Sequence, residues 1–296
     1  MYTPEEIQHR FDAVTLKYLQ NKNRGGSSGQ KGTRYEDYFA VYKLAQLARR
    51  IIAFDSNVQF SSQLLAFVDD LIIEINAAQI QHYQLKNSAN VSWTSGKHPI
   101  QKDFANQQKL NHNRYPRSHM FLVVADQACA TRLVANIPSD IQPFSRVSYF
   151  PYAPDTMALV DQLPGFKHAL TYLSAFENPE PDKLDYVAKA LIGAWVTSNF
   201  TNVSGKELLL TAQRQTPQYI RSFETTFEID PQLEKILSSI EDLRYNLAKG
   251  FLHWDYADGL QYGVQPYSIE TEPFRRLQER IIHHNPRTFE ELEPLL

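Results

Sequence analysis

Residues 67–88 read FVDDLIIEINAAQIQHYQLKNS, and this stretch decides the fold of the first half of the chain. It predicts two strands joined by a tight connection near residues 76–78, because apolar runs stand on both sides of a short break. Side chains alternate across a strand, so Gln84 and Lys86 share one face of the second strand. A hairpin folded at the break brings Asp70 to the same end as Lys86. The sequence therefore predicts that an acid, an amide and a lysine converge at one sheet edge.

These three side-chain types suit metal-assisted phosphoryl chemistry. The carboxylate of Asp70 and the amide oxygen of Gln84 are hard oxygen ligands of the kind that Mg²⁺ prefers. Such an ion polarises a phosphoryl group and lowers the pKa of a bound water. The ammonium of Lys86 is then placed to orient that water or to neutralise the charge that develops on the phosphate. A surface hairpin with solvated polar ends is the alternative, and the spacing alone leaves both interpretations open.

An acid followed, at the end of the next strand, by Gln84-Leu85-Lys86 resembles the PD-(D/E)XK restriction-endonuclease-like nuclease superfamily. The Gln-x-Lys form is similar to that of Mrr-like enzymes and of effector nucleases in bacterial anti-phage defence systems. The resemblance implies that Asp70 and Gln84 bind the metal and that Lys86 is the catalytic lysine. Many members carry Asp or Glu where this chain has Gln84, so the site lacks one negative charge. The resemblance covers roughly residues 30–125.

A helix upstream of the hairpin supplies a fourth candidate. Apolar residues recur at helical spacing over residues 33–54, which predicts a helix. Glu36 stands at the edge of its apolar stripe and can lean toward the sheet, as the helix glutamate of the superfamily does. We therefore expect Glu36 to complete the metal site or to support it. A surface salt-bridge acid is the alternative, and Asp37 is the second candidate for the same role.

The elements around the hairpin agree with the core that the resemblance implies. The sequence predicts an α/β fold in which helix, three strands, helix and strand follow in order, the αβββαβ core with a mixed sheet flanked by helices. After the first helix, the predicted ranges are, in order, 58–61, 65–74, 81–87, 100–113 and 120–125.

The chain is long enough for two domains, and its character changes near residue 150. We expect a restriction-endonuclease-like nuclease domain over residues 1–150. Residues 151–296 are expected to form a mainly helical accessory or partner-binding domain. Within it, the aromatic segments 251–256 and 262–267 form either strands or a partner-binding patch.

Charge is unevenly distributed along a chain whose net charge is −3. Residues 1–118 hold 15 Lys and Arg against 10 Asp and Glu, and residues 119–296 hold 15 against 23. A mildly basic front half is compatible with phosphate contacts, although ordinary charge scatter explains it equally well. The polar stretch 103–117, which includes Gln107, either contacts phosphates and bases or forms the wet face of a helix. The glycine-rich segment 21–32 predicts a loop.

No apolar run approaches the length of a membrane span, and the first residues lack the pattern of a signal peptide. The single cysteine, Cys129, excludes an internal disulfide and suits a reducing compartment. We therefore expect a cytoplasmic protein with no membrane partner.

The resemblance implies a metal-dependent endonuclease that hydrolyses DNA phosphodiester bonds with Mg²⁺ or Mn²⁺. We expect double-stranded DNA as its substrate, while the residues leave RNA open. As in the anti-phage effectors, we expect control by a regulatory protein partner or by assembly into a homo-oligomer. The alternative is a non-catalytic nuclease-fold subunit of a multi-protein complex, because Gln84 stands at the second metal position.

Overall fold

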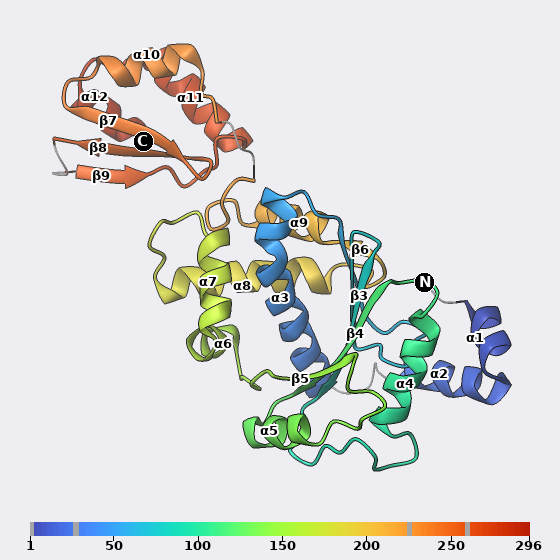
Figure 1. Ribbon diagram of the computed structural model, residues 1–296. Helices are drawn as coiled ribbons and strands as arrows, with labels where there is room; N and C mark the ends of the chain where they lie inside the picture. Colours follow the sequence, from blue (N-terminus) through green and yellow to red (C-terminus); the bar gives the residue numbers. More distant parts are fainter. Residues whose placement is uncertain (1–2, 26–29, 224–226, 258–260) are drawn as a thin grey trace. The chain divides into compact units, whose positions relative to one another are not determined.

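The computed structural model describes residues 3–25, 30–223, 227–257 and 261–296. Six strands form one mixed sheet, flanked by helices (Figure 1). The strands are β1 (Val58–Ser61), β2 (Leu71–Ile75), β3 (Gln79–Lys86), β4 (Arg117–Val124), β5 (Ser145–Tyr149) and β6 (Val203–Ser204), in the order β5-β4-β3-β2-β1-β6. The pairs β6–β1, β1–β2 and β2–β3 are antiparallel, whereas the pairs β3–β4 and β4–β5 are parallel.

The helices that accompany this sheet in the chain order are α1 (Pro4–Arg10), α2 (Ala13–Gly25), α3 (Gln30–Ala53), α4 (Ile100–Asn111), α5 (Gln127–Ala135), α6 (Thr156–Gln162), α7 (Pro164–Leu173), α8 (Pro181–Val196) and α9 (Gly205–Gln215). From α3 to β4 the chain runs helix, three strands, helix and strand, which is the predicted order. The glycine-rich segment 21–32 is helical at both ends, since α2 continues to Gly25 and α3 begins at Gln30. Residues 26–29 of that predicted loop lie outside the described residues.

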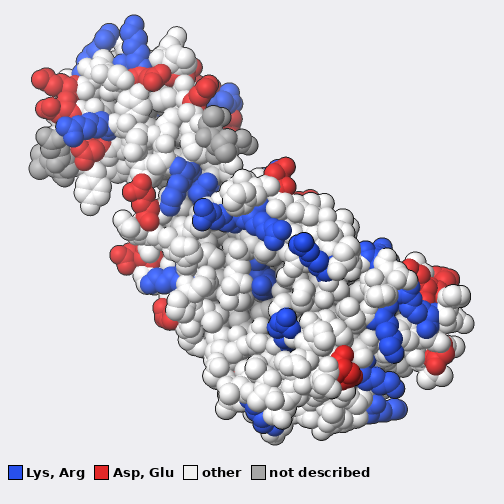
Figure 2. All heavy atoms as spheres, in the orientation of Figure 1, with Lys and Arg blue, Asp and Glu red and all other residues white. Residues whose placement is uncertain are grey.

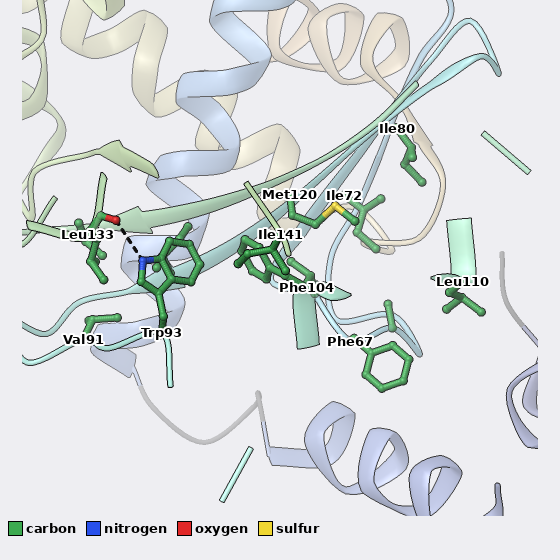
Figure 3. Packing of buried hydrophobic residues seen from close by; sticks show 14 of the residues in the cluster. Phe67, Ile72, Ile80, Val91, Trp93, Phe104, Leu110, Met120, Leu133 and Ile141 are labelled. Atoms are coloured by element: carbon green, nitrogen blue, oxygen red, sulfur yellow. Dashed lines mark hydrogen bonds between the residues drawn. The ribbon is translucent and has the colours of Figure 1, made fainter. Parts of the chain in front are cut away.

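The two faces of the sheet pack against different helices because side chains alternate along β3. Tyr83 points to the α3 face, where its ring meets Phe39 of α3 edge to face at 5.2 Å between centroids. The opposite face carries the apolar cluster drawn in Figure 3, in which Phe104 of α4 packs with Ile72 of β2 and Met120 of β4. Burial on both faces fixes the register of the central strands, since a slip by one residue would exchange the two sets.

The predicted hairpin is present, with Leu71 opposite Tyr83 and Ile75 opposite Gln79. Its turn falls at the predicted position, and Asn76 and Ala77 both have positive φ, at 51° and 54°. Two successive residues with positive φ match the twist of an antiparallel pair. The turn therefore sets the register that places Asp70, just before β2, beside the end of β3.

The first strand of the hairpin is shorter than the predicted range 65–74. β2 begins at Leu71, and residues 62–70 are irregular. Gln63 has a positive φ of 55°, which takes this segment out of an extended conformation. Its backbone N–H instead bonds to the carbonyl of Asp69 at 2.7 Å. Asp70 consequently lies on a loop and not within a strand.

Contacts divide the chain into two compact units that interleave in sequence. One unit comprises Met1–Ala169 and Leu191–Leu209, and the other comprises Leu170–Ala190 and Leu210–Leu296. This division into compact units does not follow the predicted domain boundary at residue 150. Whether residues 1–150 and 151–296 form separate domains stays a prediction. The six-stranded sheet belongs to the first unit, including β6, which comes from residues 203–204.

The second unit combines helices with a sheet of its own, and it also holds the first part of α8. It contains α10 (Pro231–Ser239), α11 (Glu272–His284), α12 (Phe289–Leu292) and the 3₁₀ turn η1 (Glu293–Leu295). It also contains a three-stranded antiparallel sheet made of β7 (Leu243–Ala248), β8 (Phe251–Tyr256) and β9 (Gln261–Val264). Of the two interpretations of the aromatic segments, the strand is therefore the one seen for 251–256 and for the start of 262–267. Within the described ranges, no helix has the length and apolarity that crossing a membrane requires.

The cluster under the β2–β3 hairpin gives a direct test of this packing. Phe104 is fully buried and meets Trp93 edge to face at 5.6 Å. We expect Phe104→Ala to lower the free energy of unfolding by about 3–5 kcal/mol, because it removes buried apolar surface and leaves a cavity. Denaturant unfolding measures this change, with Val14→Ala as the control, since Val14 is 78% exposed. Equal losses in the two variants would contradict the assigned core.

Candidate active site

Asp70 is anchored to the end of β3. Its Oδ2 accepts a hydrogen bond from the Gln84 side-chain Nε2, and a second one from the backbone N–H of Leu85 at 2.7 Å. Its own carbonyl accepts from Ser62 Oγ at 2.9 Å. The structure therefore brings the predicted acid and the predicted amide into direct contact, with Gln84 buried at 3% exposure.

Glu36 reaches this place from α3. Gln63 Nε2 donates to Glu36 Oε2 at 3.1 Å, and the same Gln63 is bonded through its backbone to Asp69. Gln63 therefore links Glu36 to the loop that carries Asp70. Burial, and after it the negative charge of Asp70, raises the pKa of Glu36 to about 8.

Lys86 stands at the end of β3, opposite Val124 of the parallel strand β4. It is half-buried, and its positive charge partly opposes the rise in the pKa of Glu36. All four predicted residues, Glu36, Asp70, Gln84 and Lys86, are therefore gathered at one end of the sheet. Whether they act as a catalytic set stays a prediction.

Asp37, the second candidate on the helix, has a different contact. Its Oδ1 accepts a hydrogen bond from Trp195 Nε1 of α8 at 3.0 Å. Burial raises its pKa, and the bond from Trp195 counteracts that rise. Asp37 thus joins α3 to α8, while Glu36 faces the predicted site.

The donor set fits a small hard cation. It offers two carboxylates, Glu36 and Asp70, and one amide, whereas Mg²⁺ sites commonly use one or two carboxylates and keep several waters. In the part of the chain that the structure describes, no three His, Cys, Asp or Glu side chains form a metal-binding group. The set is therefore poorer in charge than a site with a third acid, as the presence of Gln84 predicts. A bound cation would offset the repulsion between Asp70 and Glu36.

A buried polar network under the loop is a feature that the sequence did not indicate. Gln107 of α4 is fully buried, and its Oε1 accepts from the backbone N–H of Phe67 at 2.9 Å and of Val68 at 3.3 Å. Its Nε2 donates to Asn111 Oδ1 at 3.0 Å. Neither alternative for Gln107, a nucleic-acid contact or a wet helix face, is correct. A glutamine on a polar helix gives no sequence signal for such burial.

His82 completes this network from β3. Its Nδ1 lies 2.8 Å from the carbonyl of Val68, which makes Nδ1 the donor, and its Nε2 lies 3.4 Å from Gln107 Nε2. Burial lowers the pKa of His82 to about 4, so the ring is neutral near pH 7 and its Nε2 can accept. The loop before Asp70 is thereby held from α4 and from β3 at once.

No protein family, no curated protein and no solved structure matches this chain.

The raised pKa of Glu36 predicts a pH-dependent stability. Between the ordinary value of 4.5 and about 8, the folded state holds a proton that the unfolded state has lost. The contribution of Glu36 to the free energy of unfolding is therefore fully present below pH 4.5 and is lost as the pH rises through the folded-state pKa of about 8. Glu36→Gln does not titrate, so in EDTA we expect its stability relative to wild type to rise by roughly 2–4 kcal/mol between about pH 5 and about pH 9.

Denaturant unfolding of the two proteins across this pH range measures the change. A difference that stays constant with pH would show that Glu36 is ionised throughout and would contradict the assigned environment.

The network around Gln107 predicts a second effect on stability. Gln107→Leu keeps the approximate volume of the side chain but removes the oxygen that accepts from the backbone N–H groups of Phe67 and Val68. We expect a loss of roughly 2–4 kcal/mol in the free energy of unfolding, because buried unpaired donors are costly. Lys109→Leu, on the exposed side of the same helix, is the matched control and should change stability by less than about 0.5 kcal/mol. Similar values for both variants would contradict the role given to Gln107.

Proposed function

We propose that this protein is a metal-dependent endonuclease that hydrolyses DNA phosphodiester bonds, with double-stranded DNA as the substrate. The observation that carries the proposal is the meeting of Asp70, Gln84, Lys86 and Glu36 at one end of a mixed sheet. The order helix, three strands, helix and strand around them supports a restriction-endonuclease-like core. These four residues come from separate segments of the sequence but lie at the same end of the sheet. Their side chains are of the types that metal-assisted phosphoryl chemistry needs.

Asp70, Glu36 and the amide oxygen of Gln84 would hold Mg²⁺ or Mn²⁺, with help from the backbone carbonyl of Leu85. The bound ion supplies polarisation of the phosphoryl group and a lowered pKa for water. Lys86 donates hydrogen bonds to the attacking water and to a phosphate oxygen, so its charge stabilises the pentavalent transition state. The β3 backbone positions Lys86, because Asp70 binds the N–H of the residue directly before it.

The cellular role that we propose comes from the sequence resemblance. By that resemblance the protein is an effector nuclease of a bacterial anti-phage system and works in the cytoplasm. A regulatory protein or self-association into a homo-oligomer controls its activity. The second compact unit, with its own sheet and helices, is available for that control.

A second candidate function is a non-catalytic interaction subunit that retains this fold. Two observations favour it. The amide nitrogen of Gln84 donates to Asp70 Oδ2. An Asp or Glu at position 84 would instead repel the Asp70 carboxylate. In addition, β9 is an edge strand with exposed aromatic and apolar side chains, since Tyr262 is 79% and Val264 is 42% exposed. Exposed apolar groups on a sheet edge are typical of partner binding.

Cleavage of plasmid and linear DNA with Mg²⁺, with Mn²⁺ and with EDTA tests the proposal. We expect metal-dependent cleavage by wild type and a loss of roughly 100-fold or more in Lys86→Ala, because its charge acts in the transition state. Lys97→Ala is the matched control, since Lys97 is exposed and stands outside the site. Single-stranded RNA in the same assay distinguishes the two nucleic acids.

Mn²⁺ binding, followed by calorimetry, provides a readout that needs no turnover. Binding by wild type and its loss in Asp70→Ala would support the metal site even where an activating partner is required. Absence of both binding and cleavage in folded wild type would overturn the nuclease proposal in favour of the interaction subunit.

A further inference from the structure

Lys43 lies on α3, seven residues after Glu36, and the site as described so far does not use it. Residues seven apart lie on the same side of a helix, about 10 Å apart along its axis. Its side chain is half-buried on the side of α3 that faces β3. Lys43 therefore lies two turns from Glu36 along the same helix, on the face of the sheet to which Tyr83 points.

The contacts of Lys43 are unusual for a lysine. Its Nζ donates to Gln46 Oε1 at 3.2 Å and lies 5.5 Å from the centroid of the Tyr83 ring. Tyr83 directly precedes Gln84 on β3, so the ammonium lies close to the strand that carries the predicted site, on the face opposite to the Gln84 side chain. Gln46 is exposed, which puts the ammonium within reach of solvent and of a ligand.

Three other lysines of the described chain have carboxylate partners. Lys183, Lys189 and Lys206 form ion pairs of 2.6–3.1 Å with Asp182, Asp185 and Asp55. Across the described ranges of the chain, no carboxylate lies within ion-pair distance of Lys43. Burial lowers the pKa of Lys43 to about 8, and no acid opposes this change. A desolvated cation without a counter-ion is stabilised by an anionic ligand.

The surrounding surface favours a phosphate as that anion. Figure 2 shows several Lys and Arg side chains on the face that lies over α3, and few acidic ones there. Neighbouring phosphates of one strand are spaced about 3.4 Å apart along a duplex axis. A separation of about 10 Å between Glu36 and Lys43 thus corresponds to about three nucleotides along an aligned strand.

We propose that Lys43 binds a backbone phosphate of the substrate, about two or three nucleotides from the bond that is cut. This inference rests on the proposed nuclease function and extends it from the reacting centre to the path of the strand along α3. Lys43 is a substrate-binding residue and has no part in the chemical step. The competing account is that Lys43 only packs on the Tyr83 ring, as a cation–π contact that stabilises the fold.

Binding of a short fluorescent DNA duplex in EDTA, where no cleavage occurs, separates these accounts. The salt dependence of the affinity counts phosphate contacts, since each one contributes about 0.9 to the slope of log K against log salt. Over a range of roughly 50–300 mM KCl we expect Lys43→Met to reduce this slope by about one contact. Near the middle of the range, its affinity should fall by about five-fold.

Two matched variants complete the design. Lys43→Arg retains the charge and is expected to keep the wild-type slope. Lys109→Met removes an exposed lysine from α4, on the opposite face of the sheet, and is also expected to keep that slope. If Lys43→Met has a lowered unfolding midpoint, Lys43→Gln replaces it as the neutral variant, because it keeps a polar group beside Gln46.

The outcomes distinguish the inference from the function on which it rests. A wild-type slope in folded Lys43→Met or Lys43→Gln would overturn the phosphate site and leave the nuclease proposal standing. Failure of wild type to bind DNA, together with failure to bind Mn²⁺, would overturn both. A reduced slope in the neutral variants with nearly unchanged turnover at saturating DNA is the expected result.

Discussion

Asp70 lies on an irregular loop, and the arrangement of the site depends on how its carboxylate is tied to β3. One oxygen, Oδ2, accepts from both the side chain of Gln84 and the backbone N–H of Leu85. Because the backbone donor belongs to the residue before Lys86, the distance between acid and lysine is fixed through the strand. The loop just before Asp70 is held by Gln107, whose amide oxygen accepts from two consecutive backbone N–H groups. A loop residue thereby gains the placement that a strand residue would have.

α3 carries two partly buried ionisable side chains of opposite charge, Glu36 and Lys43. Burial raises the pKa of Glu36 to about 8 and lowers that of Lys43 to about 8, so the charged form of each is disfavoured. A cation beside Glu36 would favour its ionised form, and a phosphate beside Lys43 would favour its protonated form. Under the proposed function, a metal and a nucleic-acid strand are complementary to the helix at both points. Binding of these two ligands at Glu36 and Lys43 would require no change in the fold.

The hairpin was predictable because its information is local. Alternation along residues 67–88 and the small residues of the turn suffice to place Asp70 beside Gln84 and Lys86, and one periodic stripe places Glu36. Gln107 and Gln63 were not predictable, because their partners are backbone groups of an irregular loop that leave no pattern in the sequence. The interleaved units also escape local analysis, since β6 is only two residues long and pairs with a strand that is far away in the chain.

β6 pairs with β1 through Val203 opposite Phe60 and Ser204 opposite Gln59, and so covers the outer edge of the sheet. The carbonyl of Phe200 and the N–H of Asn202 extend this cover, through Ser62 and the side chain of Ser61. A protein truncated at residue 150 would lack this cover and present unpaired strand groups to other molecules, which promotes aggregation. For expression of the six-stranded sheet without the C-terminal sheet, a boundary after residue 215 keeps both β6 and the whole of α9. The last strand of this sheet is made long after the others, so the sheet edge stays open during synthesis until that segment leaves the ribosome.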